Sequence, residues 1–221
     1  MDQRLKIISD VLIDRYNDRY LKLGKDVKTL GWGSSEQQRY RFSVSSTLIG
    51  TFEDKQVLDI GCGFGDYCLF LRESSKNFKS YTGIDINEKL ILEAKGNVTG
   101  ENINFYQFNL LEEDPKHLGN VDLAFMFGIL NFNLKEKMDN FEYSKLFITR
   151  AFSLANEALV FDVISENRDP NYPYEDFIYY HNPLKLIEFC FSLTPFVSFL
   201  HDYQSIPQRE MTIFLSKKNR L

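Results

Sequence analysis

The sequence is short of cysteine, of positive charge and of long apolar runs. Its 221 residues include three cysteines and one tryptophan and carry a net charge of -5 at pH 7. Cys62, Cys68 and Cys190 form neither an even disulfide set nor a metal-type cluster, so we expect free thiols in a reducing cytoplasm and no metal site. The acidic balance argues against a broad nucleic-acid or anionic-membrane surface.

No apolar run approaches the roughly 18 residues that a membrane helix needs. The first segment, "MDQRLKIISDVLIDRY", is charged throughout, which excludes a signal peptide and a membrane span there. These absences predict a cytoplasmic protein without a membrane partner. Phenylalanine (20) and tyrosine (12) are plentiful, so we expect a core and pocket walls rich in rings.

Short apolar runs alternate with helical patterns through the middle of the chain. The predicted strands are residues 56–60, 80–84, 103–108, 121–127 and 158–164. Helices are predicted between them at residues 66–75, 87–96 and 143–155. This alternation is typical of a parallel, doubly wound sheet with right-handed crossovers.

The two ends of the chain extend this pattern. Helices are predicted near residues 5–23 and 35–48 at the start and at 184–193 near the end. Strands at 196–203 and 210–216 are separated by only "QSIPQR", too short for a crossover helix, so they should pair antiparallel. We therefore predict an α/β fold, a mostly parallel seven-stranded sheet with a C-terminal antiparallel hairpin. A helical lid at residues 1–50 precedes the sheet domain at 51–221.

Local signals set some helix ends. Ser35 with Gln38 three residues later resembles a capping box at the start of the second helix. Asn87 is predicted as the N-cap of the helix at 87–96, and Gly96 as its stop.

A glycine-rich turn follows the first predicted strand, in "QVLDIGCGFGDY". Gly61, Gly63 and Gly65 do not have the G-x-G-x-x-G spacing of dinucleotide binders. Asp59 stands just before the turn, where a diphosphate would be repelled. The turn opens a helix, whose first N–H groups face a ligand. These features favour a ligand that is cationic or amino-bearing at this point over a tight turn without a ligand.

A second carboxylate follows the next predicted strand. Asp85 in "GIDIN" lies where an acidic side chain accepts both hydroxyls of a ribose, although it could instead cap the next helix. An unphosphorylated adenosine that carries a cationic amino-acid arm satisfies both acids. S-adenosylmethionine is such a molecule.

The motifs "VLDIGCGFGDY", "YTGIDIN", "INFYQFNLL" and "VDLAFMFGILN" resemble those of class I S-adenosylmethionine-dependent methyltransferases, from about Gln56 to the C-terminus. More loosely, "GWGSSEQQRYRF", "FIYYHNP" and "HDY" resemble bacterial members that act on small or poorly defined substrates. The resemblance implies a cofactor site and names no substrate.

Position by position, the resemblance implies these roles. Asp59 and the backbone of the glycine turn hold the methionine amino group, and Asp85 takes the ribose hydroxyls. The cofactor contacts expected here, taken together, are Asp59, Gly61, Cys62, Gly63, Gly65, Asp85, Ile86, Asn109, Leu110 and Phe127. Asn109 stands where aspartate is commoner, which keeps an acceptor oxygen for the adenine amino group and loses the charge.

We expect the segment before the first strand to cover the cofactor. Trp32 and Arg41 are its nearest residues in this interpretation, with Arg41 paired to the methionine carboxylate. A core role for Trp32 and a solvated helix position for Arg41 are the alternatives.

The acceptor should lie over the carboxyl ends of the strands. Asn131, Tyr179 and Tyr180 are the candidate substrate contacts, and His181 is the candidate catalytic base. The alternative for His181 is a cap on the following helix. Methyl transfer needs a base only for a protonated acceptor, so the lack of a triad does not argue against catalysis.

Three function classes remain open. The first is a methyltransferase that acts on an O or N atom of a small molecule, such as a sugar or another biosynthetic intermediate. The second is a protein or RNA methyltransferase, and the third is a non-catalytic binding subunit with this fold. A nicotinamide oxidoreductase is disfavoured by the glycine spacing and Asp59.

Overall fold

Seven strands form one sheet in the computed structural model, which describes residues 3–202 and 210–219. The sheet order is β3-β2-β1-β4-β5-β7-β6. The bounds are β1 Gln56–Ile60, β2 Ser80–Asp85, β3 Ile103–Gln107, β4 Val121–Met126, β5 Ala155–Ile164, β6 Val197–Leu200 and β7 Glu210–Ser216. The central strands pair in parallel, and β7 runs antiparallel to both β5 and β6. The predicted fold class is therefore confirmed, and the predicted β6–β7 connection lies outside the described residues.

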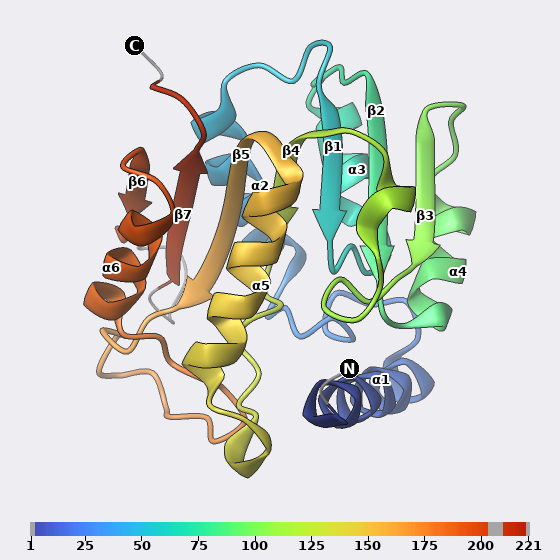
Figure 1. Cartoon of the computed structure of the whole chain (residues 1–221). Coiled ribbons are helices and arrows are strands. Elements are labelled where there is room, and N and C mark those ends of the chain that lie inside the picture. Colours follow the sequence, from blue (N-terminus) through green and yellow to red (C-terminus); the bar gives the residue numbers. More distant parts are fainter. Residues whose placement is uncertain (1–2, 203–209, 220–221) are drawn as a thin grey trace.

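Helices cover both faces of the sheet, and one further helix lies across the carboxyl ends of its strands. Their bounds are α1 Gln3–Leu23, α2 Ser35–Ile49, α3 Asp66–Glu73, α4 Glu88–Asn97, α5 Asn140–Leu154 and α6 Pro183–Leu193, with short 3₁₀ turns η1 Pro115–Leu118 and η2 Lys135–Lys137. Figure 1 shows α5 in front of the sheet, α2 and α3 behind it, and α1 across the end to which the arrowheads of β1 to β3 point. None of the helices described has the length and apolarity needed to cross a bilayer.

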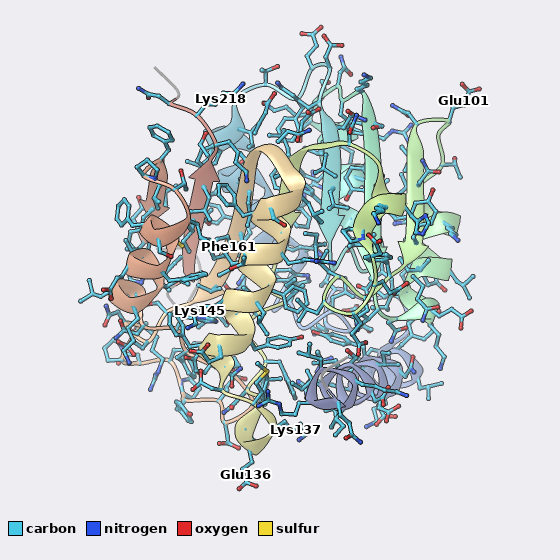
Figure 2. The ribbon with its side chains drawn as sticks, in the orientation of Figure 1. Glu101, Glu136, Lys137, Lys145, Phe161 and Lys218 are labelled. Carbon is cyan, nitrogen blue, oxygen red and sulfur yellow. The ribbon has the colours of Figure 1, made fainter. Side chains whose placement is uncertain are left out.

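Each face of the sheet buries its own apolar cluster. Phe161 lies behind α5 with its side chain fully buried. Glu101 and Lys218 instead point outward, at the end of the sheet opposite α1 (Figure 2). On the other face, the ring of Phe42 in α2 packs 5.0 Å from Tyr67 and 4.9 Å from Phe127, measured between centroids. The expected ring-rich core is thus built largely on the α2 side.

Two predicted helix ends are shifted. Ser34, not Ser35, is the N-cap of α2, because its side chain accepts a hydrogen bond from the amide of Gln37. Helix α4 continues past Gly96 to Asn97, where the chain turns to an extended backbone at Val98. The N-cap at Asn87 is confirmed by hydrogen bonds from the amides of Lys89 and Leu90.

Residues 1–50 divide into two parts with different packing. Helix α2 buries Arg41, Phe42 and Ser45 and contacts β5 and β7, so it forms part of the sheet's covering layer. Helix α1 buries only Ile8 and otherwise lies across the ends of the strands.

Candidate active site

The glycine turn after β1 has a backbone that other residues adopt at a cost. Gly61 and Gly63 have φ values of +77° and +53°. A Cβ on Gly61 would lie 2.3 Å from the side chain of Ile129, and one on Gly63 would lie 2.9 Å from Leu30. Glycine is therefore needed here for both conformation and space.

Gly65, the third glycine of the turn, has a different role. Its φ is +77°, and a Cβ there would lie 2.9 Å from the ring of Phe105. It precedes α3 as its N-cap residue and is not among the residues that line the cavity described below.

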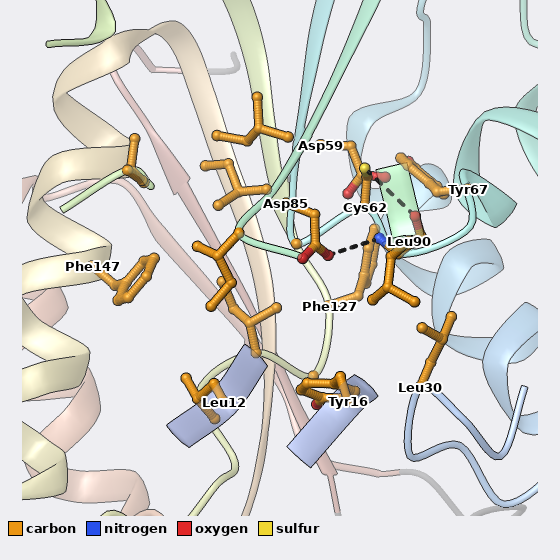
Figure 3. A pocket seen from close by; sticks show the side chains of 18 of the residues that line it. Leu12, Tyr16, Leu30, Asp59, Cys62, Tyr67, Asp85, Leu90, Phe127 and Phe147 are labelled. Carbon is orange, nitrogen blue, oxygen red and sulfur yellow. Dashed lines mark hydrogen bonds between the residues drawn. The ribbon is translucent and has the colours of Figure 1, made fainter. Parts of the chain in front are cut away.

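Asp85 joins the turns after β1 and β2. One carboxylate oxygen accepts a hydrogen bond from the amide of Gly63 at 3.1 Å, and the other accepts one from the amide of Asn87 at 2.9 Å. Burial raises the pKa of Asp85 to about 6, against the lowering effect of these backbone donors. Each oxygen keeps lone pairs for further donors. Figure 3 shows this carboxylate pointing into the space between the turn and Tyr16.

Asp59 is more deeply buried than Asp85. The hydroxyl of Tyr81 donates a hydrogen bond to one of its oxygens. Burial raises the pKa of Asp59 to about 7, with a further increase from Asp85 and Asp66. The carboxylate therefore binds a proton readily unless a cation approaches it.

These carboxylates line a cavity of about 130 Å³ between α1 and the strand ends. One part of its wall comes from the loop before α2, from α2 and from α3: Leu30, Trp32, Gln38, Phe42, Asp66 and Tyr67. Another part comes from the segments after β2 and β3 and from α5: Ile86, Phe108, Asn109, Leu110, Tyr143 and Phe147. Tyr67 and Phe147 lie on opposite sides of Asp85 in Figure 3.

Helix α1 covers this cavity and is tied to the strand ends. Ser9, Leu12 and Tyr16 are its lining residues. The side-chain amide of Asn109 donates to the Ser9 hydroxyl at 2.8 Å, and the hydroxyl of Tyr20 donates to Glu93 in α4. The cover is thus held by polar contacts that span most of its length.

The charged side chains that line the described cavity are all acidic. Its lining includes Asp59, Asp66 and Asp85 and, in the described parts of the chain, no lysine, arginine or histidine. A ligand with positive charge and hydroxyl donors complements such a wall, and the bare backbone at Gly61 and Gly63 leaves room for it. These are the properties of S-adenosylmethionine, so the residues present fit the group.

Arg41 is not at the cavity. It is 4% exposed, and its guanidinium forms a two-pronged ion pair with Glu210 at the start of β7. The structure therefore does not bring Arg41 to the position expected for a methionine carboxylate, because the carboxylate of Glu210 already takes that face of the guanidinium. Trp32, the other expected cover residue, does line the cavity.

His181 is also away from the cavity. Its side chain is fully buried, and its Nε2 lies 3.0 Å from the carbonyl oxygen of Leu130. Burial lowers the pKa of His181 to about 4, so the ring is neutral at pH 7. The structure therefore does not bring this expected catalytic base to the cavity, since His181 is not among its lining residues. The helix cap considered as its alternative is Asn182.

The three expected substrate contacts lie in the segments after β4 and β5. The Asn131 side-chain oxygen accepts a hydrogen bond from the amide of Ile164, and the Tyr179 ring packs against His181 at 4.6 Å. The ring of Tyr180 stacks on Tyr174 at 5.2 Å, near the exposed surface. Asn131, Tyr179 and Tyr180 do not line the cavity.

The residues expected beside the adenine and the methyl group all lie at the cavity. Ile86, Asn109 and Leu110 line the cavity, as does Phe127 at the end of β4. The Asn109 side-chain oxygen, however, accepts from the amide of Leu111 at 3.1 Å. Asn109 therefore organises the turn and the cover as well as facing the cavity.

Gln38 and Asp66 are cavity residues that the sequence interpretation missed. Gln38 donates from its side-chain nitrogen to Asp66 at 3.0 Å, and both line the wall near Trp32. Burial raises the pKa of Asp66, and Gln38 opposes that shift. Two signals were present: Asp66 directly follows the glycine turn, and Gln38 lies three residues before Arg41, one helical turn away.

Comparisons with known proteins show the family of this chain. The model of a methyltransferase domain family matches residues 51–178, which is more than half of the chain. The chain therefore belongs to this family, the class I S-adenosylmethionine-dependent methyltransferases, and is an enzyme of the methyltransferase class with S-adenosylmethionine as its cofactor. No curated protein matches the sequence.

Solved structures share the fold at low identity. Magnesium protoporphyrin IX methyltransferase from Synechocystis PCC 6803, solved with bound S-adenosylhomocysteine, has a TM-score of 0.66 at 17% identity, covering 97% of this chain and 100% of its own. A putative methyltransferase in complex with the Trm112 activator from Haloferax volcanii has a TM-score of 0.66 at 11% identity, covering 91% and 97%. A putative S-adenosylmethionine-dependent methyltransferase from Listeria monocytogenes has 0.59 at 15%, covering 81% and 98%. At these identities the likeness is one of fold.

Proposed function

We propose that this methyltransferase transfers a methyl group to an O or N atom of a small-molecule acceptor. The observation that carries the proposal is the cover over the cavity. Ser9, Leu12 and Tyr16 of α1 close the space above the strand ends, and α1 is bonded to the turn after β3 and to α4. An enclosed site of this kind favours a small acceptor over a folded macromolecule.

The cofactor contacts proposed from the resemblance keep their roles where the residues line the cavity. Asp59 and the turn at Gly61, Cys62 and Gly63 hold the amino-acid arm, and Asp85 accepts the ribose hydroxyls. In the same proposal the adenine lies between Ile86, Leu110 and the ring-bearing wall from α5. Asn109, which stands where aspartate is commoner, holds α1 through its hydrogen bond to Ser9. The turn that contains Asn109 faces the edge of the adenine in this proposal.

The carboxylate of the methionine arm needs a partner other than Arg41. We place it near Trp32 and Gln38, whose side-chain amide lies beside Asp66. A neutral amide donor binds a carboxylate more weakly than a guanidinium does. In this proposal, affinity for the arm therefore depends more on its ammonium group than on its carboxylate.

When bound, S-adenosylmethionine supplies a methyl group on a sulfonium, an excellent leaving group. The protein residues align the acceptor with that methyl carbon and exclude water. The apolar rings of Phe42, Tyr67 and Phe127 serve exclusion, since all three are buried around the same wall. A methyl acceptor that is a hydroxyl or an ammonium group also requires a base, for which the cavity offers Asp66, since Asp59 is paired with the amino-acid arm.

We assign the lid to α1 alone, within the N-terminal segment 1–50, and the platform to α2 together with residues 51–221. Helix α2 supports this division because its buried face contacts β5 and β7. A protein that lacks residues 1–23 should then keep its sheet and lose cofactor affinity.

The test is a screen of metabolite pools for S-adenosylhomocysteine release, followed by mass spectrometry of the methylated product. We expect turnover with a small-molecule fraction and its loss in the Asp85→Ala variant. Parallel arms contain total RNA and total protein as acceptors. Turnover confined to either of those arms would overturn the small-acceptor proposal. Cofactor binding without turnover in every arm would instead favour a non-catalytic subunit.

A further inference from the structure

A buried ionic group lies directly behind the cavity wall. Arg41 from α2, Asp162 from β5 and Glu210 from β7 are 4%, 1% and 2% exposed. The guanidinium of Arg41 bonds both carboxylate oxygens of Glu210. These three residues, called here the rear ionic group, do not line the cavity.

Two contacts connect the rear ionic group to the cavity. One oxygen of Asp162 accepts a hydrogen bond from the amide of Gly128 at 2.6 Å. The guanidinium carbon of Arg41 lies 4.5 Å from the centre of the Trp32 ring, a cation–π distance. Gly128 and Trp32 both line the cavity, and the two touch: a Cβ on Gly128 would lie 3.0 Å from the Trp32 ring.

The charges in the rear ionic group do not balance. One guanidinium faces two carboxylates, and the second oxygen of Asp162 is buried without a hydrogen-bond partner in the described parts of the chain. Burial, followed by the nearby Glu210, raises the pKa of Asp162, whereas Arg41 and the Gly128 amide lower it. A buried carboxylate with an open oxygen destabilises a fold, so stability alone does not account for it.

We propose that Asp162, held beside the Arg41–Glu210 pair, is a positioning residue for methyl transfer that acts through Gly128 and Trp32. Asp162 holds Gly128, which follows β4, against the ring of Trp32. It thereby determines the position of the cavity wall that contacts both the methyl donor and the acceptor. This inference rests on the proposed function. It gives the rear ionic group a role separate from cofactor affinity, which depends on Asp59 and Asp85.

The proposal predicts that the wall responds to protonation of Asp162. The groups that face Asp162 are Glu210 from β7, Arg41 from α2 and the Gly128 amide from the turn after β4. An ionised carboxylate accepts from an amide more strongly than a protonated one. The Gly128–Trp32 contact is therefore held more firmly as pH rises through the neutral range.

Trp32 allows this to be measured without an acceptor, because it is the one tryptophan in the chain. The probe is Trp32 emission, recorded as a function of pH in the full-length protein saturated with S-adenosylmethionine. We expect a transition in the neutral range for the wild type and one of clearly smaller amplitude for Asp162→Asn, which keeps the shape, offers Gly128 a weaker, uncharged acceptor and does not titrate. The remaining amplitude comes from the cavity carboxylates Asp59, Asp66 and Asp85. The matched control is Asp122→Asn, the same change in the neighbouring strand β4, since the Asp122 carboxylate accepts from the amide of Gln56 and does not line the cavity. This control should leave the transition in place.

A second variant fixes the direction. Glu210→Gln removes the neighbouring negative charge and leaves Arg41 nearby, so the emission midpoint should move to lower pH. An unmoved midpoint in Glu210→Gln, or a transition of unchanged amplitude in Asp162→Asn, would overturn the proposal. Both variants are first checked for an unfolding transition like that of the wild type.

Turnover gives the functional readout, using the metabolite fraction found in the screen. We expect Asp162→Asn to lower kcat by about tenfold to a hundredfold, with a KM for S-adenosylmethionine close to that of the wild type. An unchanged kcat would refute positioning. If no fraction supports turnover, the proposed function fails, and the emission experiments still decide whether Asp162 controls the wall.

Discussion

Two pairs of buried carboxylates lie at the same edge of the sheet and meet different surroundings. Asp59 near the end of β1 and Asp85 at the end of β2 line a cavity whose described wall holds no basic side chain. Asp162 and Glu210, in β5 and β7, face the guanidinium of Arg41 inside the protein. The first pair, called here the open pair, has no cationic side chain beside it and can pair with a cationic ligand. The second pair, called here the closed pair, is largely neutralised by Arg41. Buried charge at one sheet edge thus serves binding on one side and geometry on the other.

The largest effect should come from removing the internal cation. Arg41→Met leaves Glu210 and Asp162 buried together, so the free energy of unfolding should fall by about 3–5 kcal/mol in urea titrations. Arg39→Met is the control on the same helix, because the Arg39–Glu73 pair has side chains 49% and 56% exposed. That variant should lose less than about 1 kcal/mol. Equal losses in the two variants would show that Arg41 holds no closed ionic group.

The next effect concerns the open pair. Asp85→Ala removes a charge-assisted acceptor of the ribose hydroxyls, so S-adenosylmethionine should bind about 2–3 kcal/mol more weakly, or roughly 30- to 150-fold, by calorimetry. Asp176→Ala is the control, since Asp176 forms an exposed pair with Lys135 and lies away from the cavity. Unchanged affinity in Asp85→Ala would remove the ribose assignment.

Stability should depend on pH in a direction that the open pair sets. The folded-state pKa values of Asp59 and Asp85, about 7 and about 6, lie above those of an unfolded chain. The folded protein therefore holds protons that the unfolded chain has released, and its stability falls as pH rises from about 4 toward 7. Asp59→Asn removes one such group. The unfolding free energy of Asp59→Asn minus that of the wild type should be about 2 kcal/mol larger at pH 6.5 than at pH 5. A difference that is smaller at pH 6.5 than at pH 5 would contradict the burial of that charge.

The smallest effect is expected at His181. The ring is buried and neutral, so His181→Asn should change S-adenosylmethionine affinity by less than about 0.5 kcal/mol and leave the pH profile of turnover unaltered. Calorimetry and a pH–rate series measure the two. If the pH–rate profile of His181→Asn lost its acidic limb, His181 would act as a base. The segment after β5 would then have to move to expose the ring.

The sequence predicted the open pair well because strand ends determine it. Asp59 and Asp85 lie at fixed positions relative to β1 and β2, and parallel strands bring their carboxyl ends to one edge. The glycines that keep the backbone bare were readable for the same reason. No long-range packing had to be known.

The closed pair was not predictable from local pattern. Gln38 and Arg41 lie one turn apart on α2, and only the way α2 packs on the sheet decides which of them faces the cavity. Glu210 is 169 residues from Arg41 in the sequence, so nothing near Arg41 indicated its partner. His181 and Tyr179 lie between β5 and α6, where a bridge between Ser165 and His181 holds the chain against the sheet. Nothing in the local sequence indicated that bridge.

The central claim is that S-adenosylmethionine binds between α1 and the strand ends, and Trp32 tests it directly. Because this lone tryptophan lines the cavity, its emission should change saturably as S-adenosylmethionine is added at constant pH, with the same Kd that calorimetry gives. Trp32→Phe should lose the signal and keep calorimetric binding, and NAD should produce no change. Calorimetric binding without any change in Trp32 emission would place the cofactor elsewhere and contradict the account.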